Sequence, residues 1–311
     1  MTGRATGDPT GNAVGPAAGP VADPDPSGQA IDAHHHLWHP ARGDYGWMPE
    51  GGLLPRPHLP AELAPQLAAC GVGRTVLVQA APTLAETHYL LGLADATDWV
   101  AGVVGWVDFA DTAHRAALDG LAAHPKLVGL RPMVQDIAED GWVTGAALDW
   151  AFDAMTEAGL TFDALGLPRH ARPFLDRLSR HPDLVAVLDH GLKPDLAGGD
   201  LTVWHEDMRR LAEGTGAWVK LSGLATEAAP PADPARATAA DVAHATAPAV
   251  ERLLGLFGPA RTIWGSDWPV CRLACDYRAW WDAARALTDH LAPAERAAIF
   301  GGNAATAYRL R

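Results

Sequence analysis

Short apolar runs alternate with longer stretches of helical periodicity from Ile31 to the end of the chain. The apolar runs predict eight strands, at residues 31–36, 75–80, 101–108, 127–134, 160–165, 185–190, 217–222 and 261–267. The stretches between them predict helices, among them 84–97, 113–123, 146–158, 171–181, 203–214 and 239–257. Eight strand–helix alternations over about 280 residues match one (β/α)8 barrel, so we predict a single TIM-barrel domain over residues 30–311.

A doubly wound parallel sheet is the alternative that this alternation leaves open. That fold predicts a glycine-rich phosphate-binding turn after the first strand, where this chain has three histidines and Trp38. The barrel is therefore favoured. The Ala- and Pro-rich segment 225–240 predicts a long loop after the seventh strand, at the end where barrels bind ligands.

Composition narrows the class of protein. The formal net charge of −13 argues against nucleic acid or an anionic membrane surface as the main partner, since both need a basic footprint. No apolar run reaches the ~20 residues of a membrane span, and no secretory signal pattern opens the chain. Cys70, Cys271 and Cys275 cannot all pair within one chain, which indicates a reducing, cytoplasmic location.

Residues 1–29 differ from the rest of the chain. They are mainly Gly, Ala, Pro, Asp and Thr, with almost no large apolar side chain. Such a segment cannot bury enough apolar surface to offset the entropy of ordering it, so we expect a disordered tail.

The first predicted strand ends in His34, His35 and His36. Side chains alternate along a strand, so His34 and His36 would point the same way, about 7 Å apart, and His35 the opposite way. Two imidazoles on one face can hold a metal ion, a substrate carbonyl or an activated water. Partly exposed histidines at a strand end, with no such role, are the alternative.

Polar residues also end the other predicted strands. They are Arg131, Asp163, Asp189 with His190, Lys220 with Ser222, and Asp267. In a TIM barrel the carboxyl ends of the strands surround one axis, so these side chains would meet there.

Three of these side chains have the chemistry of catalytic groups. Asp267 would serve as a general base or metal ligand, His190 would polarise a carbonyl or bind metal, and Arg131 offers a planar fork of donors. The structural alternatives are a helix cap or ion pair for Asp267, a core histidine for His190, and charge neutralisation for Arg131.

Aromatic side chains lie in or beside several predicted strand ends. Indole faces bind sugar or aromatic rings well, and the early loop carries Tyr45 and Trp47, which we place over the site. The expected substrate contacts are Tyr45, Trp47, Trp38, Asp163, His170 and Trp268.

Seven motifs, in order along nearly the whole chain, carry a resemblance to a known family. They are residues 31–38 (IDAHHHLW), 78–80 with Glu86 and Thr87, 128–131 (VGLR), 188–190 with Lys193 and Pro194, 220–224 (KLSGL), 264–270 (WGSDWPV) and 302–304. The chain resembles the amidohydrolase superfamily, and within it the branch of sugar lactonases that contains L-fuconolactonase and L-rhamnono-lactonase. The resemblance implies a site built on His34, His36, His190 and Asp267, with Arg131 binding substrate.

Two departures from the superfamily pattern affect this expectation. Two-metal members have a bridging lysine or glutamate at the end of strand four, where this chain has Arg131, and Lys126 precedes that strand. Pro132 also replaces a histidine that many relatives carry. We therefore expect at most one divalent ion, zinc by preference, on His34, His36, His190 and Asp267, with a metal-independent reaction as the alternative.

The resulting hypothesis is a hydrolase that opens a sugar-acid lactone by attack of water, with Asp267 as general base. A metal-dependent decarboxylase of an aromatic acid on the same barrel is the alternative, and a non-catalytic binding protein is a third. The expected partner is a small molecule, and the oligomeric state stays open.

Overall fold

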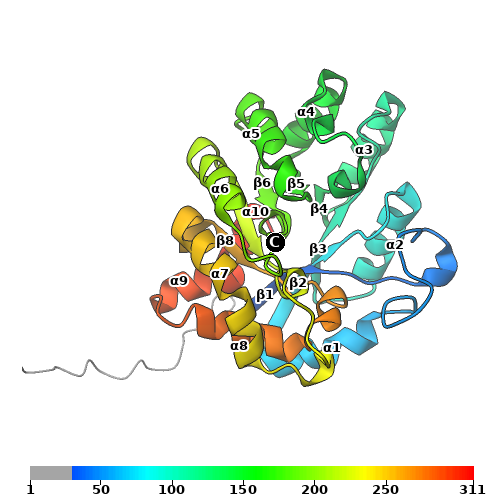
Figure 1. Cartoon of the computed structure of the whole chain (residues 1–311). Helices are drawn as coiled ribbons and strands as arrows, with labels where there is room; N and C mark the ends of the chain where they lie inside the picture. Colours follow the sequence, from blue (N-terminus) through cyan, green and yellow to red (C-terminus); the bar gives the residue numbers. More distant parts are fainter. Residues whose placement is uncertain (1–29) are drawn as a thin grey trace, which may run out of the picture.

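The computed structural model describes residues 30–311, so the predicted disordered tail at 1–29 lies outside the described residues. Eight strands form one sheet in the order β1 to β8, and every neighbouring pair is parallel (Figure 1). The strands are β1 (Ala30–His35), β2 (Val72–Val78), β3 (Val100–Gly105), β4 (Leu127–Leu130), β5 (Thr161–Ala164), β6 (Ala186–Leu188), β7 (Trp218–Leu221) and β8 (Thr262–Trp264). The predicted TIM barrel is confirmed.

The barrel closes just beyond the end of β8. His35 pairs with Trp268 in a parallel bridge, the His36 N–H donates to the Trp268 carbonyl at 2.7 Å, and the Asp267 N–H donates to the His34 carbonyl at 2.7 Å. The closing hydrogen bonds therefore place the histidines of the first strand directly beside Asp267, although more than 230 residues separate them.

Helices surround the strands (Figure 1). They are α1 (Pro60–Cys70), α2 (Leu84–Asp95), α3 (Arg115–Ala122), α4 (Asp149–Ala158), α5 (Ala171–Arg180), α6 (Thr202–Gly214), α7 (Ala239–Phe257), α8 (Tyr277–Leu287), α9 (Pro293–Ala297) and α10 (Asn303–Ala307). Local sequence explains several boundaries: Thr83 and Thr238 cap α2 and α7, and Gly159 ends α4 in a left-handed conformation. All six helices named from the sequence are present.

Several strands end earlier than the sequence predicts. Arg131, His190 and Asp267 all lie in loops that follow their strands, and the last two have φ of 56° and 57°. A strand cannot continue through a residue of positive φ, so the chain turns out of the sheet there. The loop predicted after strand seven contains two short 3₁₀ turns, η8 (Ala225–Glu227) and η9 (Pro234–Arg236).

The carboxyl-terminal segment packs at the amino ends of the strands. The Asn303 amide donates to the Thr262 carbonyl at 2.7 Å, and Thr161 donates to the Ala307 carbonyl at 2.7 Å. Figure 1 shows α10 near the centre of the ring of strands. Tyr308 packs there with the inward-facing valines Val76 and Val104, which leaves the carboxyl ends of the strands as the open end.

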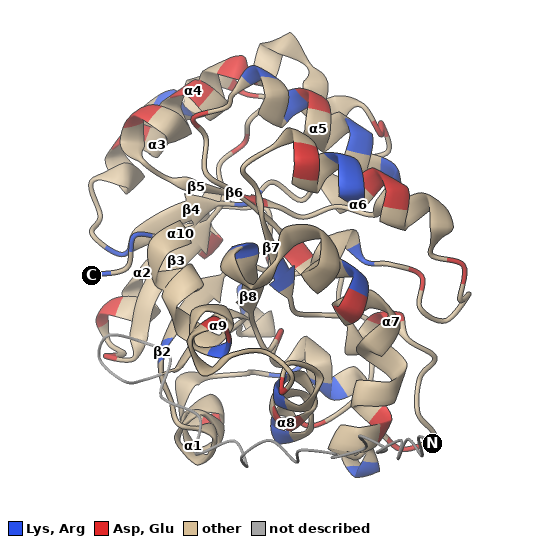
Figure 2. Ribbon diagram, turned by 90° about the vertical axis from the view of Figure 1, so that its left-hand side faces the viewer, with Lys and Arg blue, Asp and Glu red and all other residues tan. Residues whose placement is uncertain are grey.

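The outer helices carry mixed charge. Figure 2 shows Lys or Arg alternating with Asp or Glu along α5 and α6, where Arg180 pairs with Asp176 at 3.1 Å and Arg210 with Glu206 at 3.0 Å. Exposed pairs of this kind contribute little to stability, because water screens the charges. No helix within residues 30–311 has the length and apolar character needed to cross a membrane.

Candidate active site

A cavity of about 310 Å³ lies at the carboxyl ends of the strands. Its lining combines aromatic, apolar and charged side chains: His36, Trp38, Trp47, Ala80, Arg131, Met133, Gln135, Asp136, Leu165, His190, Lys193, Asp267 and Val270. The size lies at the lower end of the range of ligand sites, about 300–1,000 Å³, and suits one small ring.

His36 and Asp267 lie side by side in the lining of this cavity. His36 Nδ1 lies 2.8 Å from the Val78 carbonyl, which can only accept, so Nδ1 carries a proton. His36 Nε2 lies 3.3 Å from Asp267 Oδ1. A lone pair on Nε2 would face the negative carboxylate, so this contact requires either a second proton on the ring or a cation between the two groups.

Asp267 is nearly enclosed by imidazoles. It is 4% exposed and has a φ of 57°, a costly conformation for a residue with a Cβ, of about 1–2 kcal/mol. Burial alone would raise the pKa of this carboxyl, but His190, His36 and His34 hold it well below its usual range. Asp267 is therefore an anion at neutral pH.

His34 lies deeper than His36 and is fully buried. Its Nδ1 is 3.1 Å from Lys220 Nζ, and its Nε2 is 3.3 Å from an Arg131 guanidinium nitrogen and 3.7 Å from Asp267 Oδ1. Burial and the Lys220 charge lower the pKa of His34 well below the ordinary value, so its ring is neutral. As predicted from strand alternation, His35 points elsewhere, with its Nε2 2.8 Å from the Thr75 hydroxyl.

Beneath His34 lies a buried cluster of charges. Lys220 Nζ is 2.6 Å from Asp163 and 2.9 Å from Asp189, and all three side chains are fully buried. Burial alone would raise the pKa of Asp189, but Lys220 and His34 hold it well below its usual range. Burial raises the pKa of Asp163 to about 6.

Asp163 was expected to contact substrate, and its position corrects that expectation. The Tyr308 hydroxyl donates to its carboxylate at 2.8 Å, and Lys220 occupies the other side. With 0% exposure, Asp163 does not line the cavity. Asp163 lies below the cavity, where its carboxylate already accepts hydrogen bonds from Lys220 and Tyr308.

His190 lines the cavity beside Asp267. Its Nδ1 is 2.9 Å from the Ser222 hydroxyl, and the following Gly223 leaves no room for a Cβ, which would lie 2.5 Å from the same nitrogen. Burial lowers the pKa of His190 to about 4, so the ring is neutral at pH 7. A neutral imidazole held in this way can donate to a carbonyl oxygen or bind a metal.

Arg131 reaches the cavity from the end of β4, and its guanidinium is held from behind. It donates to Asp189 at 3.2 Å and to the Gln79 carbonyl. Only 3% of the residue is exposed. The fork is thus rigidly placed, with part of its positive charge balanced by Asp189.

Aromatic residues of the loop between β1 and α1 form one wall. Trp38 and Trp47 line the cavity, with ring centroids 5.6 Å apart, and the Trp47 indole donates to the Ala80 carbonyl at 2.6 Å. Tyr45 lies behind this wall and donates to buried Glu86 at 2.7 Å. Tyr45 therefore supports the wall and does not line the cavity.

Two more expected substrate contacts lie outside the cavity. His170 is fully buried and its Nδ1 accepts from the Leu167 N–H at 2.9 Å. Trp268 is fully buried in the core and packs edge-on against His58, with centroids 5.4 Å apart. Neither residue lines the cavity, although His170 Nε2 and Trp268 Nε1 are buried without a hydrogen-bond partner.

Several lining residues were not predicted as site residues. They are Ala80, Met133, Gln135, Asp136, Leu165, Lys193 and Val270. Ala80, Met133 and Leu165 lie at the ends of predicted strands, where we took polar residues alone as candidates. Lys193 stands in one of the recognised motifs, which is the signal that could have identified it.

The geometry provides two overlapping sets of metal-binding atoms. His34, His36 and Asp267 form one set and His34, Asp189 and His190 the other, with the donor atoms of each set within 4.8 Å of one another. Three N and O ligands with an open position suit a catalytic zinc ion, and the opposed His36 and Asp267 atoms fit a cation. His34 belongs to both sets, Asp189 was not among the predicted ligands, and a single ion stays a prediction.

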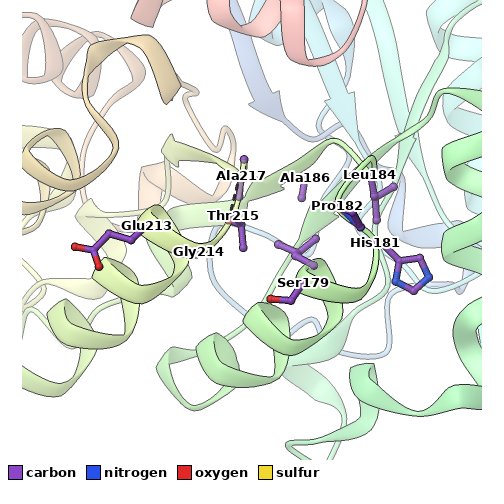
Figure 3. A pocket seen from close by; sticks show the side chains of 11 residues that line it. Ser179, His181, Pro182, Leu184, Ala186, Glu213, Gly214, Thr215 and Ala217 are labelled. Atoms are coloured by element: carbon purple, nitrogen blue, oxygen red, sulfur yellow. Dashed lines mark hydrogen bonds between the residues drawn. The ribbon is translucent and has the colours of Figure 1, made fainter.

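Other hollows lie away from this site. The one in Figure 3 lies between α5 and α6 at the amino ends of β6 and β7, and its lining includes Ser179, His181, Glu213 and Thr215. The catalytic end of a TIM barrel is the opposite one. Cys271 and Cys275 are free, buried thiols that do not line the cavity. Cys271 lies in the 3₁₀ turn Val270–Leu273, and Cys275 lies beyond its end.

Comparison with known proteins places the chain in a family. The amidohydrolase family model matches residues 31–310. L-fucono-1,5-lactonase of Burkholderia ambifaria is 44% identical, with 90% of this chain and 95% of that protein covered; L-fucono-1,5-lactonase of Burkholderia multivorans is 35% identical, with 90% and 96% covered. A crystal structure of an amidohydrolase from Burkholderia multivorans with bound zinc superposes with a TM-score of 0.83 at 34% identity, covering 91% of this chain and all of that one. The chain belongs to the amidohydrolase family.

Proposed function

We propose that this protein is a lactonase that opens a sugar-acid lactone such as L-fucono-1,5-lactone by attack of water on the ester carbonyl. The observation that carries the proposal is the convergence of an anionic carboxylate, two imidazoles and a guanidinium on one small aromatic-walled cavity. The curated relatives that act on this lactone are similar over nearly the whole chain.

In the proposed reaction the sugar ring stacks on Trp38 and Trp47, and its carbonyl faces Arg131 and His190. Asp267 takes a proton from water as the water oxygen bonds to the carbonyl carbon. The guanidinium and imidazole donors stabilise the negative charge that develops on the carbonyl oxygen. The bond to the ring oxygen then breaks, that oxygen receives the proton, and the product is an open-chain hydroxy acid.

His34, His36 and Asp267 are the residues that would hold a metal ion, for which we propose zinc, with His190 adjoining them. When bound, such an ion supplies Lewis-acid polarisation of a carbonyl and lowers the pKa of water. The Val78 carbonyl fixes the His36 tautomer that leaves Nε2 directed at Asp267. A lactone ester is electrophilic enough that the fixed donors alone are the competing explanation for activity.

The test is a pH-indicator assay of an aldonolactone panel with purified protein, with and without chelator. Hydrolysis of L-fucono-1,5-lactone well above the spontaneous rate supports the proposal. Asp267→Asn is the matched control, because it keeps the side-chain shape and cannot accept a proton. No enzymatic hydrolysis of any aldonolactone would refute the proposed function.

Decarboxylation of an aromatic acid, the alternative on the same barrel, gains no specific support from the cavity or from the two lactonase relatives. Metal analysis and CO₂ release separate the two reactions, since that decarboxylation needs a tightly bound divalent ion. A cytoplasmic location stays a prediction from the cysteine content.

A further inference from the structure

The loop after β6 contains an uncommon backbone feature. His190, Gly191, Leu192 and Lys193 all have positive φ, at 56°, 54°, 58° and 53°. A run of four such residues, three of them with a Cβ, forms a left-handed turn that L-amino acids adopt only at a cost. Strain of this kind persists where the surroundings enforce it, and it concentrates at functional sites.

The turn brings two side chains into the cavity. The Lys193 N–H donates to the His190 carbonyl at 2.9 Å, which closes a turn of three residues. Residues i and i+3 of so tight a turn lie above one another. His190 and Lys193 accordingly both line the cavity, whereas Leu192 is fully buried and Gly191 packs where a Cβ would lie 2.7 Å from Leu253.

Lys193 differs from the other cations of the site in having no fixed partner. Lys220 is paired with Asp163 and Asp189, and Arg131 with Asp189. Within residues 30–311, no carboxylate oxygen lies within the 4.0 Å ion-pair distance of Lys193. The charge of Lys193 acts on the carboxyl of Glu227. Burial raises the pKa of Glu227, and the positive charge of Lys193 lowers it. Lys193 is thus half-buried, has no carboxylate partner among the described residues and belongs to the cavity lining.

The proposed reaction creates a charge that needs such a partner. A neutral lactone gives a carboxylic acid, which ionises beside Asp267 in a cavity that Asp136 also lines. The Arg131 fork is already held by Asp189 and the Gln79 carbonyl. Lys193 is the cavity-lining cation that no carboxylate within residues 30–311 already balances, so it supplies the charge that the new carboxylate needs in addition to Arg131.

We propose that Lys193 is a substrate-binding residue that recognises the carboxylate of the ring-opened sugar acid, a role that rests on the lactonase function proposed above. Loss of a hydrogen bond to a charged group weakens binding by about 10- to 100-fold. We therefore expect Lys193→Met to weaken binding of L-fuconate by that factor. Binding of L-fucitol, the neutral alcohol with the same carbon chain, should change less than twofold.

The experiment is calorimetric titration of the full-length wild type and variants with both compounds. Lys193→Arg keeps the charge and should retain most of the L-fuconate affinity. Lys126→Met is the matched control, because Lys126 precedes β4, its ammonium donates to the Ala94 carbonyl in α2, and it does not line the cavity. It should bind both compounds as the wild type does.

Four results would overturn the assignment of Lys193. They are no binding of L-fuconate by the wild type, unchanged affinity in Lys193→Met, equal losses for the acid and the alcohol, or the same loss in Lys126→Met. The titration needs no turnover, so it separates the two proposals. Wild-type protein that binds the acid but hydrolyses no lactone would refute the lactonase function alone, and active enzyme with unchanged Lys193→Met affinity would refute the role of Lys193 alone.

Discussion

Substitution of Gly223 by alanine tests whether the position of His190 matters for catalysis. A Cβ at residue 223 would lie 2.5 Å from His190 Nδ1 and 2.8 Å from Cγ of the same ring. Ordinary carbon contacts begin at about 3.5 Å, so the ring must move by about 1 Å. That movement breaks the 2.9 Å contact between Nδ1 and the Ser222 hydroxyl and turns the ring relative to Asp267.

The substitution has two separable costs. Gly223 has a φ of 62°, so any Cβ adds about 1–2 kcal/mol of backbone strain. The collision with His190 comes in addition. Gly71, at the end of α1, has a φ of 69° and open space around its Cβ position, so Gly71→Ala carries the strain without the collision.

We expect both variants to lose about 1–2 kcal/mol of unfolding free energy from strain, and Gly223→Ala to lose more. A displacement of about 1 Å at a reacting group can reduce the rate about 100-fold, so kcat/KM should fall by that order in Gly223→Ala alone. The assay is lactone hydrolysis at pH 7, with folding checked by circular dichroism and urea denaturation. A folded Gly223→Ala enzyme with wild-type kcat/KM would show that the observed position of His190 is not required.

Further predictions concern the base, the buried charges, pH and metal. Asp267→Asn should fold normally and lose about 10²–10⁴-fold in kcat, and near wild-type hydrolysis would exclude it as the base. Lys220→Met should cost about 3–5 kcal/mol in urea denaturation by leaving buried Asp163 without a cation and Asp189 with Arg131 alone, and adding Asp163→Asn should restore part of that loss. Burial raises the pKa of Glu86 from 4.5 to about 7, so the folded state holds a proton that the unfolded state releases, and stability should fall as pH rises from 5 to 8. The difference between 4.5 and about 7 corresponds to about 3 kcal/mol, and Glu86→Gln should remove this contribution to the pH dependence in urea titrations at both pH values. Equilibrium dialysis should find no more than one zinc ion per chain, and two ions at full occupancy would contradict the single-ion site.

The barrel was predictable because parallel strands covered on both faces appear in the sequence as nearly continuous apolar runs. β2 and β3, for example, are almost wholly Val, Leu and Gly at their buried positions. The strand ends were less predictable, since each depends on where the backbone leaves the sheet. β6 ends at Leu188 and β8 at Trp264, and the residues that follow include His190 and Asp267 with positive φ, a conformation that no local pattern marks in a residue other than glycine.

The candidate site likewise has residues that the sequence predicts and residues that it does not. His34, His36, Arg131, His190 and Asp267 come together because barrel closure gathers strand ends, which topology alone predicts. Asp163 is also a strand-end residue, but its partner Tyr308 is 145 positions away along the chain, so nothing near Asp163 indicates that it is already satisfied. Lys193 enters the cavity only because of a left-handed turn, which the sequence does not reveal.

Asp163 and Asp267 show how the environment assigns different chemistry to identical side chains. Both are almost fully buried, and burial by itself raises the pKa of either carboxyl. Around Asp163 that effect prevails, to about 6, because its cation Lys220 is shared with Asp189 and the remaining donor is a neutral phenol. Around Asp267 three imidazoles outweigh burial and hold its pKa below the usual range. Asp267 alone of the two also borders the cavity, so it is the carboxylate that can meet water and substrate as an anion.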